Sequence, residues 1–163
     1  MHPDPDPVLA GQESVWQFPR PSIAQPVAMR LRVEFAGVTI AETIAGIRTI
    51  ETSHPPTYYF PRADVTAELR ANGRRSFCEW KGQAVYFDVS ANGRVAESAA
   101  WSYPEPSATF ASLAGHIAFY PALMDGCFVD GERATPQPGG FYGGWITQAV
   151  AGPFKGGPGS DFW

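Results

Sequence analysis

Short runs in which apolar and polar residues alternate recur along most of the chain. In residues 29–35, MRLRVEF, an apolar side chain at every second position predicts a strand with one face toward the core. Comparable runs predict strands over 38–43, 46–52, 74–80, 83–90, 94–103 and 116–120. Helical apolar spacing followed by a glycine predicts short helices over 61–73 and 107–115. The pattern therefore predicts a mainly β fold of antiparallel sheets with one or two short helices.

Asn92 and Gly93 are the strongest hairpin signal, because both tolerate the positive φ angles of a two-residue turn. Such a turn would place Asp88 directly opposite Glu97, on the side of the sheet away from the core. Opposed carboxylates repel each other unless both are solvated, a cation lies between them, or one is protonated. The core face would carry large apolar side chains, at Val85, Phe87 and Val89.

Glycine and proline change this picture by adding turns. The chain has 163 residues with 17 Gly and 16 Pro, about a fifth of the total, against a usual share of roughly 12%. The length suits one domain. Residues 1–12 include HPDPDP and predict a disordered tail, so the domain would span 13–163. The C-terminal segment is rich in glycine and proline but also in aromatic residues, and we expect it to pack on the domain.

The charge argues against a polyanionic partner. The net charge is −4, the isoelectric point is near 5.3, and the basic residues are scattered. Nucleic-acid binding needs basic side chains gathered on one face, so we expect no nucleic-acid partner. No long apolar run and no basic-then-apolar N-terminal segment occurs, which predicts a cytoplasmic protein without a membrane partner.

The two cysteines, Cys78 and Cys127, form no CxxC motif and have no histidine at ligand spacing. A zinc site is therefore not expected, and no other metal or cofactor is predicted. In an oxidising compartment the two could pair. Without a secretion signal, the simpler interpretation is two reduced, core-type residues.

The segment 51–61, ETSHPPTYYFP, holds the densest candidate chemistry. Glu51 could orient His54 as an acid–base partner, but only if the chain bends between them, because i and i+3 face opposite ways in a straight strand. Lys81 lies at a tight turn, and if it folds back over the polar face of the hairpin it would be the cation between Asp88 and Glu97. The candidate catalytic residues are Glu51, His54, Lys81 and Glu97; the candidate ligand-binding residues are Tyr58, Tyr59, Trp101, Tyr103 and Tyr120. Each has a structural alternative: an exposed histidine, a turn lysine, or core aromatics.

These residues leave three function classes open. The first is a pocket for an unknown small molecule, with acid–base catalysis if the ionisable residues converge. The second is a binding module whose aromatic wall holds a ligand by stacking or cation–π contact. The third is a protein-interaction domain that uses the aromatic C-terminal segment.

Several strings resemble, in order, the family known as domain of unknown function 427: ESVWQFPRP, ETSHPPTYYFPRADV, CEWKGQAVYFDV, RVAESAAWSYPEP, IAFYP and GGFYGGW. The resemblance runs from about Glu13 to the C-terminus. It implies an Mss4-like, or β-tent, arrangement of sheets. Many β-tent proteins hold zinc through paired CxxC motifs, which this chain lacks. The family also carries a nucleotidyltransferase label, yet GPFKGGPGS lacks the Gly-Lys-Ser/Thr and the flanking strand and helix of a phosphate-binding loop.

Overall fold

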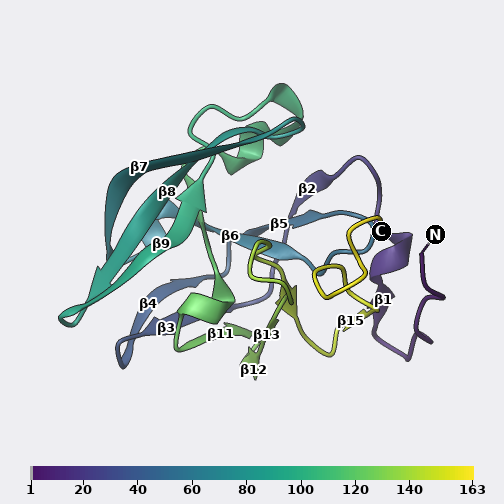
Figure 1. Cartoon of the computed structure of the whole chain (residues 1–163). Helices are drawn as coiled ribbons and strands as arrows, with labels where there is room; N and C mark the ends of the chain where they lie inside the picture. Colours follow the sequence, from purple (N-terminus) through teal and green to yellow (C-terminus); the bar gives the residue numbers. More distant parts are fainter. Residues whose placement is uncertain (1) are drawn as a thin grey trace.

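The computed structural model describes residues 2–163 as a mainly β chain with 45% of its residues in strands (Figure 1). The larger sheet has seven antiparallel strands, in the order β2 (Ile23–Pro26), β5 (Ile47–Ile50), β6 (Thr57–Pro61), β10 (His116–Phe119), β9 (Arg94–Ser102), β8 (Gly82–Ala91) and β7 (Glu68–Cys78). The smaller sheet has four, in the order β12 (Glu132–Arg133), β11 (Gly126–Val129), β3 (Leu31–Phe35) and β4 (Val38–Thr43). The fold class predicted from the sequence is confirmed. The finer Mss4-like arrangement stays a prediction.

Within residues 2–163, four short 3-10 helices lie between the strands: η1 (Val15–Gln17), η2 (Arg62–Asp64), η3 (Ala108–Leu113) and η4 (Pro121–Leu123). The helix predicted over 107–115 therefore exists, as the 3-10 helix η3. The helix predicted over 61–73 is wrong beyond its first turn, because β7 begins at Glu68 and pairs along its length with β8. The helical signal there rested on two apolar residues one turn apart, and strand pairing overrides so weak a preference.

The main core lies between the two sheets. Leu31, Val33 and Phe35 alternate along β3 as predicted and are at most 2% exposed. They pack in one cluster with Phe60 and Phe119 of the larger sheet. Because neighbouring residues of a strand point to opposite faces, the larger sheet has a second face with its own cluster. The second cluster contains Tyr59, Trp101 and Ala118 of the sheet, with Phe110 and Leu113 of η3 above them.

The hairpin between β8 and β9 has the predicted two-residue turn, with Ala91 paired to Arg94. Further from the turn, a β-bulge shifts the pairing between Phe87 and Val89. Near the bulge Ser98 has a φ of 51°, and its backbone N donates to Asp88 Oδ1 at 2.9 Å. The predicted pairing of Asp88 with Glu97 is therefore wrong, because a backbone amide occupies the place of the second carboxylate.

The surroundings of Asp88 remove the repulsion that the sequence suggested. Besides the Ser98 amide, Asn72 Nδ2 donates to Asp88 Oδ1 at 2.8 Å. These two hydrogen bonds, from Ser98 and then Asn72, lower the pKa of Asp88. Among the predicted core residues, Val89 is fully buried, but Tyr86 on the opposite face is also buried. The larger sheet therefore has no fully solvated face at this hairpin.

The C-terminal segment crosses the molecule in two short strand pairs. In the first, β13 (Thr135–Pro136) pairs with β14 (Trp145–Ile146); in the second, β15 (Val150–Ala151) pairs in parallel with β1 (Glu13–Ser14). Trp145 is 1% exposed, whereas Phe141 and Phe162 are 70% and 90% exposed. Packing of this segment thus buries only some of its aromatic side chains.

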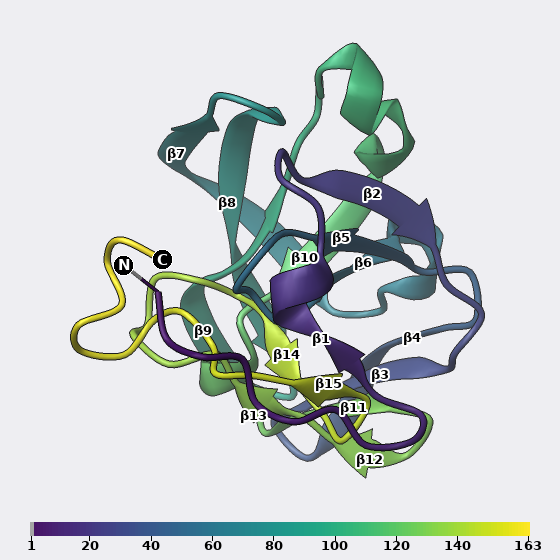
Figure 2. The same cartoon turned by 90° about the vertical axis from the view of Figure 1, so that its right-hand side faces the viewer.

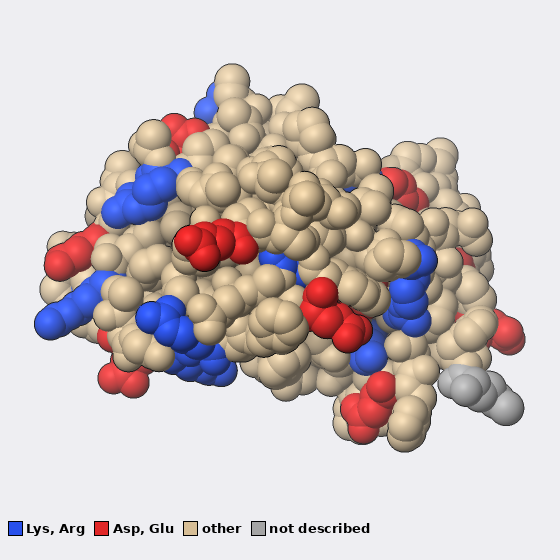
Figure 3. Space-filling model, turned by 90° about the horizontal axis from the view of Figure 1, so that it is seen from above, with Lys and Arg blue, Asp and Glu red and all other residues tan. Residues whose placement is uncertain are grey.

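The N-terminal residues run beside the end of the chain (Figure 2). Residues 2–12 contain no helix or strand, and Asp6 N donates to Gly152 O at 2.8 Å. The disordered tail inferred from composition stays a prediction. Seen from above, basic and acidic side chains are interspersed among uncharged ones, so this face carries no extended patch of one sign (Figure 3). No helix within residues 2–163 has the length and apolarity needed to cross a lipid bilayer.

Candidate functional site

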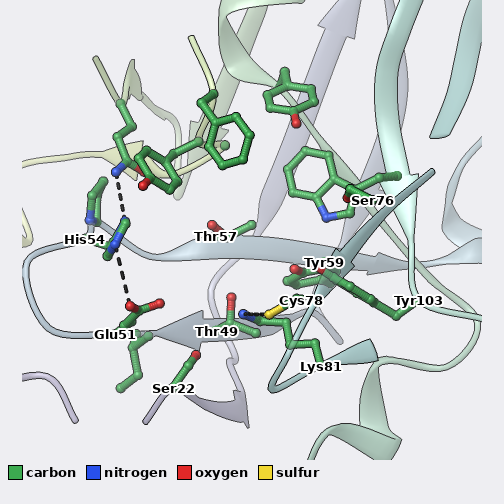
Figure 4. A pocket seen from close by; sticks show the side chains of 18 of the residues that line it. Ser22, Thr49, Glu51, His54, Thr57, Tyr59, Ser76, Cys78, Lys81 and Tyr103 are labelled. Atoms are coloured by element: carbon green, nitrogen blue, oxygen red, sulfur yellow. Dashed lines mark hydrogen bonds and ion pairs between the residues drawn. The ribbon is translucent and has the colours of Figure 1, made fainter. Parts of the chain in front are cut away.

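A cavity of about 290 Å³ opens on the second face of the larger sheet (Figure 4). Its floor comes from β5, β6 and β9, its walls from the end of β7 and the turn after it, and one side from the loop 137–143. Seven of the nine predicted site residues line it: Glu51, His54, Tyr59, Lys81, Trp101, Tyr103 and Tyr120. Four separate stretches of sequence therefore place their candidate side chains around one space.

The other two candidates, Tyr58 and Glu97, lie elsewhere. Tyr58 points to the main core, where its ring contacts Trp145 with centroids 5.0 Å apart. Burial raises the pKa of Tyr58 to about 12. Tyr58 and Tyr59 are adjacent in β6, so they could not both face the cavity. Glu97 is exposed and lines a different hollow with Arg74, beyond the loop 138–142.

The turn after β5 brings Glu51 and His54 to the same side. His54 N donates to Glu51 O at 3.0 Å, and Ser53 between them has a φ of 73°. This is the bend that a Glu51–His54 pair requires. His54 Nε2 lies 3.7 Å from Glu51 Oε2, and Arg20 Nη2 lies 3.8 Å from the same oxygen. Within residues 2–163 neither contact is as short as a hydrogen bond, so the Glu51 carboxylate keeps acceptor capacity for a ligand.

Gln137 determines which nitrogen of His54 carries the proton. Its Oε1 accepts from Gly144 N at 3.1 Å, so its Nε2 is the atom that faces Lys155 O at 2.9 Å and His54 Nδ1 at 3.0 Å. If the amide were flipped, its NH₂ group would face the Gly144 N–H, which is also a donor, and its oxygen would face Lys155 O, which is also an acceptor. Nδ1 therefore accepts, and neutral His54 carries its proton on Nε2, the atom directed toward Glu51 (Figure 4).

Burial and charge shift both titrating groups of the pair. Burial, followed by the positive charges of Lys155, Arg20 and Lys81, lowers the pKa of His54 to about 4. Burial raises the pKa of Glu51 above its usual value, although the same three cations oppose that shift. At neutral pH the pair therefore consists of an uncharged hydrogen-bond donor beside a carboxylate that is more basic than usual.

Lys81 faces the same cavity from the opposite wall. Its turn is tied to the loop before η3, because Ser107 N donates to Lys81 O at 2.9 Å and Ser107 Oγ donates to Trp80 O at 2.5 Å. The Lys81 ammonium lies 3.9 Å from Cys78 Sγ and 5.4 Å from the ring centre of Phe110. No ion pair joins Lys81 to a carboxylate within residues 2–163. The predicted role of Lys81 between Asp88 and Glu97 is therefore wrong.

Aromatic rings form the rest of the enclosure. The ring centres of Trp101 and Tyr120 lie 4.5 Å apart, and those of Trp101 and Tyr59 lie 6.3 Å apart. His54 contacts the edge of Tyr142, with ring centres at 4.7 Å. A Cβ at Gly143 would collide with the Trp101 indole, so only glycine lets the loop approach so closely.

Several lining residues were not predicted: Ser22, Thr49, Thr57, Ser76, Phe77, Cys78, Tyr86, Gln137, Phe141, Tyr142 and Gly143. The adjacent aromatics Phe141 and Tyr142, flanked by glycine pairs, carried a usable signal, since loops of this composition often close over sites. Gln137 carried none, because its role depends on contacts with residues up to 83 positions away.

Among residues 2–163, no three His, Cys, Asp or Glu side chains lie close enough together to hold a metal ion.

Comparison with known proteins adds a family but no activity. A family model described as a domain of unknown function (DUF427), with the label NTP_transf_9, matches residues 23–130, about two thirds of the chain. That range is shorter than the resemblance noted from the sequence. It includes Glu51, His54 and Lys81, and ends before Gln137. A search of curated proteins found no match. The chain belongs to the DUF427 family.

Proposed function

We propose that the cavity binds a small molecule and that Glu51 and His54 act on it as an acid–base pair. One observation carries the proposal: Gln137 holds neutral His54 with its Nε2 proton directed to a carboxylate of raised pKa, in a cavity lined by aromatic rings. Enclosed pockets with a few convergent polar groups and perturbed pKa values are the usual setting for ligand chemistry.

The geometry supports a division of roles that differs from the one suggested by the sequence. His54 Nδ1 is engaged by Gln137, so neutral His54 has only a donor to offer. Glu51 is then the base: its carboxylate takes a proton from a ligand, and its raised pKa suits that task at neutral pH. His54 donates to an oxygen of the same ligand and stabilises the negative charge that develops there. The ligand would carry a hydroxyl or a carbonyl group.

Binding can be tested by blocking the cavity. A library of small fragments is screened by ligand-detected NMR against the wild type and Thr57→Phe, which places a ring on the cavity floor. The matched control is Thr39→Phe, at an exposed position of β4. We expect fragments that bind the wild type and Thr39→Phe but not Thr57→Phe. Fragments that bind all three proteins equally, or no fragment hits at all, would contradict the proposal.

Proton transfer can be tested separately from binding. Hits with a C–H bond next to a carbonyl are incubated in D₂O, and deuterium incorporation is followed by NMR. We expect exchange with the wild type and its loss in Glu51→Gln, which keeps the shape of the side chain but removes the base. Glu97→Gln, at an exposed position outside the cavity, is the control. Exchange that persists in Glu51→Gln would rule out Glu51 as the base.

A further inference from the structure

Three cations act on the Glu51–His54 pair at one end of the cavity. Glu51 is the one acidic side chain among the described residues that line it. Lys81 also lines it, and the charges of Arg20 and Lys155 act on the same Glu51–His54 pair. Two of these cations have partners: Arg20 Nη2 donates to Thr52 O at 3.0 Å, and Lys155 Nζ donates to Trp163 O at 3.2 Å.

Of these three cations, Lys81 is the one that lines the cavity. An ammonium carries three N–H donors and no acceptor. Within residues 2–163 the Lys81 ammonium makes one hydrogen-bond contact, and it is a long one, 3.9 Å to Cys78 Sγ. The side chain is half-buried and its backbone is fixed by Ser107. A partly buried cation aimed into a cavity, without a carboxylate of its own, suits an anionic group on a ligand.

The remaining lining separates the two ends of the cavity. Thr49 and Thr57 are cross-strand partners on the floor, and they lie between the Glu51–His54 pair and the Cys78–Lys81 pair in Figure 4. Hydroxyl groups there can donate to a ligand oxygen. On the sides, Trp101 and Tyr142 present aromatic rings to the cavity. Rings on the walls and polar groups at the ends favour a flat ligand with a polar group at each end.

We infer that the ligand is a small aromatic carboxylate with a hydroxyl or carbonyl group at its far end, bound with the carboxylate on Lys81 and the other group at Glu51 and His54. The inference rests on the proposed function, because it assumes that this cavity is a ligand site. It goes further by assigning each end of the cavity a chemical group. A hydroxyl at the far end would give its proton to Glu51, and a carbonyl there would accept a hydrogen bond from His54 Nε2.

The probe is 4-hydroxybenzoate, compared with three analogues that each remove one feature. Benzoate lacks the hydroxyl group, 4-hydroxybenzamide lacks the charge, and 4-hydroxybenzylamine reverses it. Binding is measured by isothermal titration calorimetry with wild-type protein at pH 7. We expect 4-hydroxybenzoate to bind at least tenfold more tightly than the amide, and the amine not to bind. Equal affinity for the acid and the amide would overturn the inference.

Variants at Lys81 test whether this residue is the source of the preference for the acid over the amide. Lys81→Met should remove the preference for the acid over the amide, whereas Lys81→Arg should retain it. Arg30→Met is the control, because Arg30 is an exposed cation that does not line the cavity. A preference that survives Lys81→Met would overturn the assignment of the carboxylate to Lys81.

The fragment screen separates this inference from the function it rests on. If none of the four compounds binds, but neutral fragments bind the wild type and not Thr57→Phe, then the cavity is a ligand site and the anionic ligand class is wrong. If Thr57→Phe abolishes the binding of no fragment, whatever its charge, then both the proposed ligand site and the proposed ligand class are wrong.

Discussion

The two faces of the larger sheet are built from alternate residues of the same strands, yet they differ in what covers them. A second sheet covers one face, and its strands β3 and β4 pack apolar side chains against Phe60 and Phe119. Short segments cover the other face: η3 and the loop 137–143. Two packed sheets interdigitate their inner side chains in a close-packed core, whereas the short segments leave a gap between them. The cavity with the candidate residues therefore lies on the face that short segments cover.

The largest difference in the free energy of unfolding is expected between the substitution of a buried phenylalanine and that of an exposed one. Phe60 is fully buried between the sheets, and Phe77 is 76% exposed at the edge of the cavity. Phe60→Ala should lower the free energy of unfolding by about 3–5 kcal/mol, because it leaves a cavity in close-packed core. Phe77→Ala should change it by no more than about 0.5 kcal/mol. Urea unfolding of both variants measures the difference, and similar losses would mean that Phe60 is packed no better than an exposed side chain.

The second prediction concerns pH. An unfolded histidine takes up a proton near pH 6.5, but His54 in the folded protein does so only near pH 4. Between these values the unfolded state binds more protons, so the fold loses stability as the pH falls from 6.5 toward 4. The loss at pH 4.5 should be roughly 2–3 kcal/mol. The raised pKa of Glu51 acts in the opposite direction, because its protonation favours the fold.

The contribution of His54 is isolated by subtraction. The free energy of unfolding is measured at pH 7 and pH 4.5 for the wild type and for His54→Gln, which cannot take up a proton. The variant should lose less stability than the wild type over this range. An equal loss in both proteins would show that His54 is not held neutral by the fold.

Gln137 provides the third prediction, with a smaller effect on stability. In Gln137→Glu the group beside His54 Nδ1 changes from a donor to an acceptor with a negative charge. The pKa of His54 should therefore rise by about 1–3 units, as expected for an opposite charge at short range. NMR titration of the histidine ring nitrogens measures it, with His2 and His116 as internal references. An unchanged His54 titration would mean that Gln137 does not set its protonation.

Alternation along the strands was enough to predict which residues of β3 face the core and that Asn92 and Gly93 form the turn. Alternation also separates Tyr58 from Tyr59, although both were proposed as cavity residues. The bulge at Ser98 could not be predicted, because it depends on the Asp88 side chain of β8, which accepts a hydrogen bond from the backbone N of Ser98 in β9. A bulge shifts every pairing beyond it, so one local event changed the partners of half the hairpin.

The site was predictable to the extent that its residues are chemically distinctive. Glu51, His54 and Lys81 were found by residue type, and the structure brings all three to one cavity. The bend at Ser53 and the role of Gln137 were not predictable. The first needs a positive φ at a residue that is not glycine, and the second joins residues from distant parts of the chain.

The smallest expected effect tests the hairpin itself. If Asp88 and Glu97 faced each other, removing Glu97 would relieve a repulsion and stabilise the protein. In the structure Asp88 instead accepts from Ser98 N and Asn72 Nδ2, and Glu97 is exposed. Glu97→Ala should therefore leave the free energy of unfolding within about 0.5 kcal/mol of the wild type. Denaturant unfolding at low salt, where repulsion between exposed charges is strongest, is the most sensitive measurement. A larger stabilisation that disappears at high salt would instead indicate that the two carboxylates face each other directly and that the hairpin has no bulge.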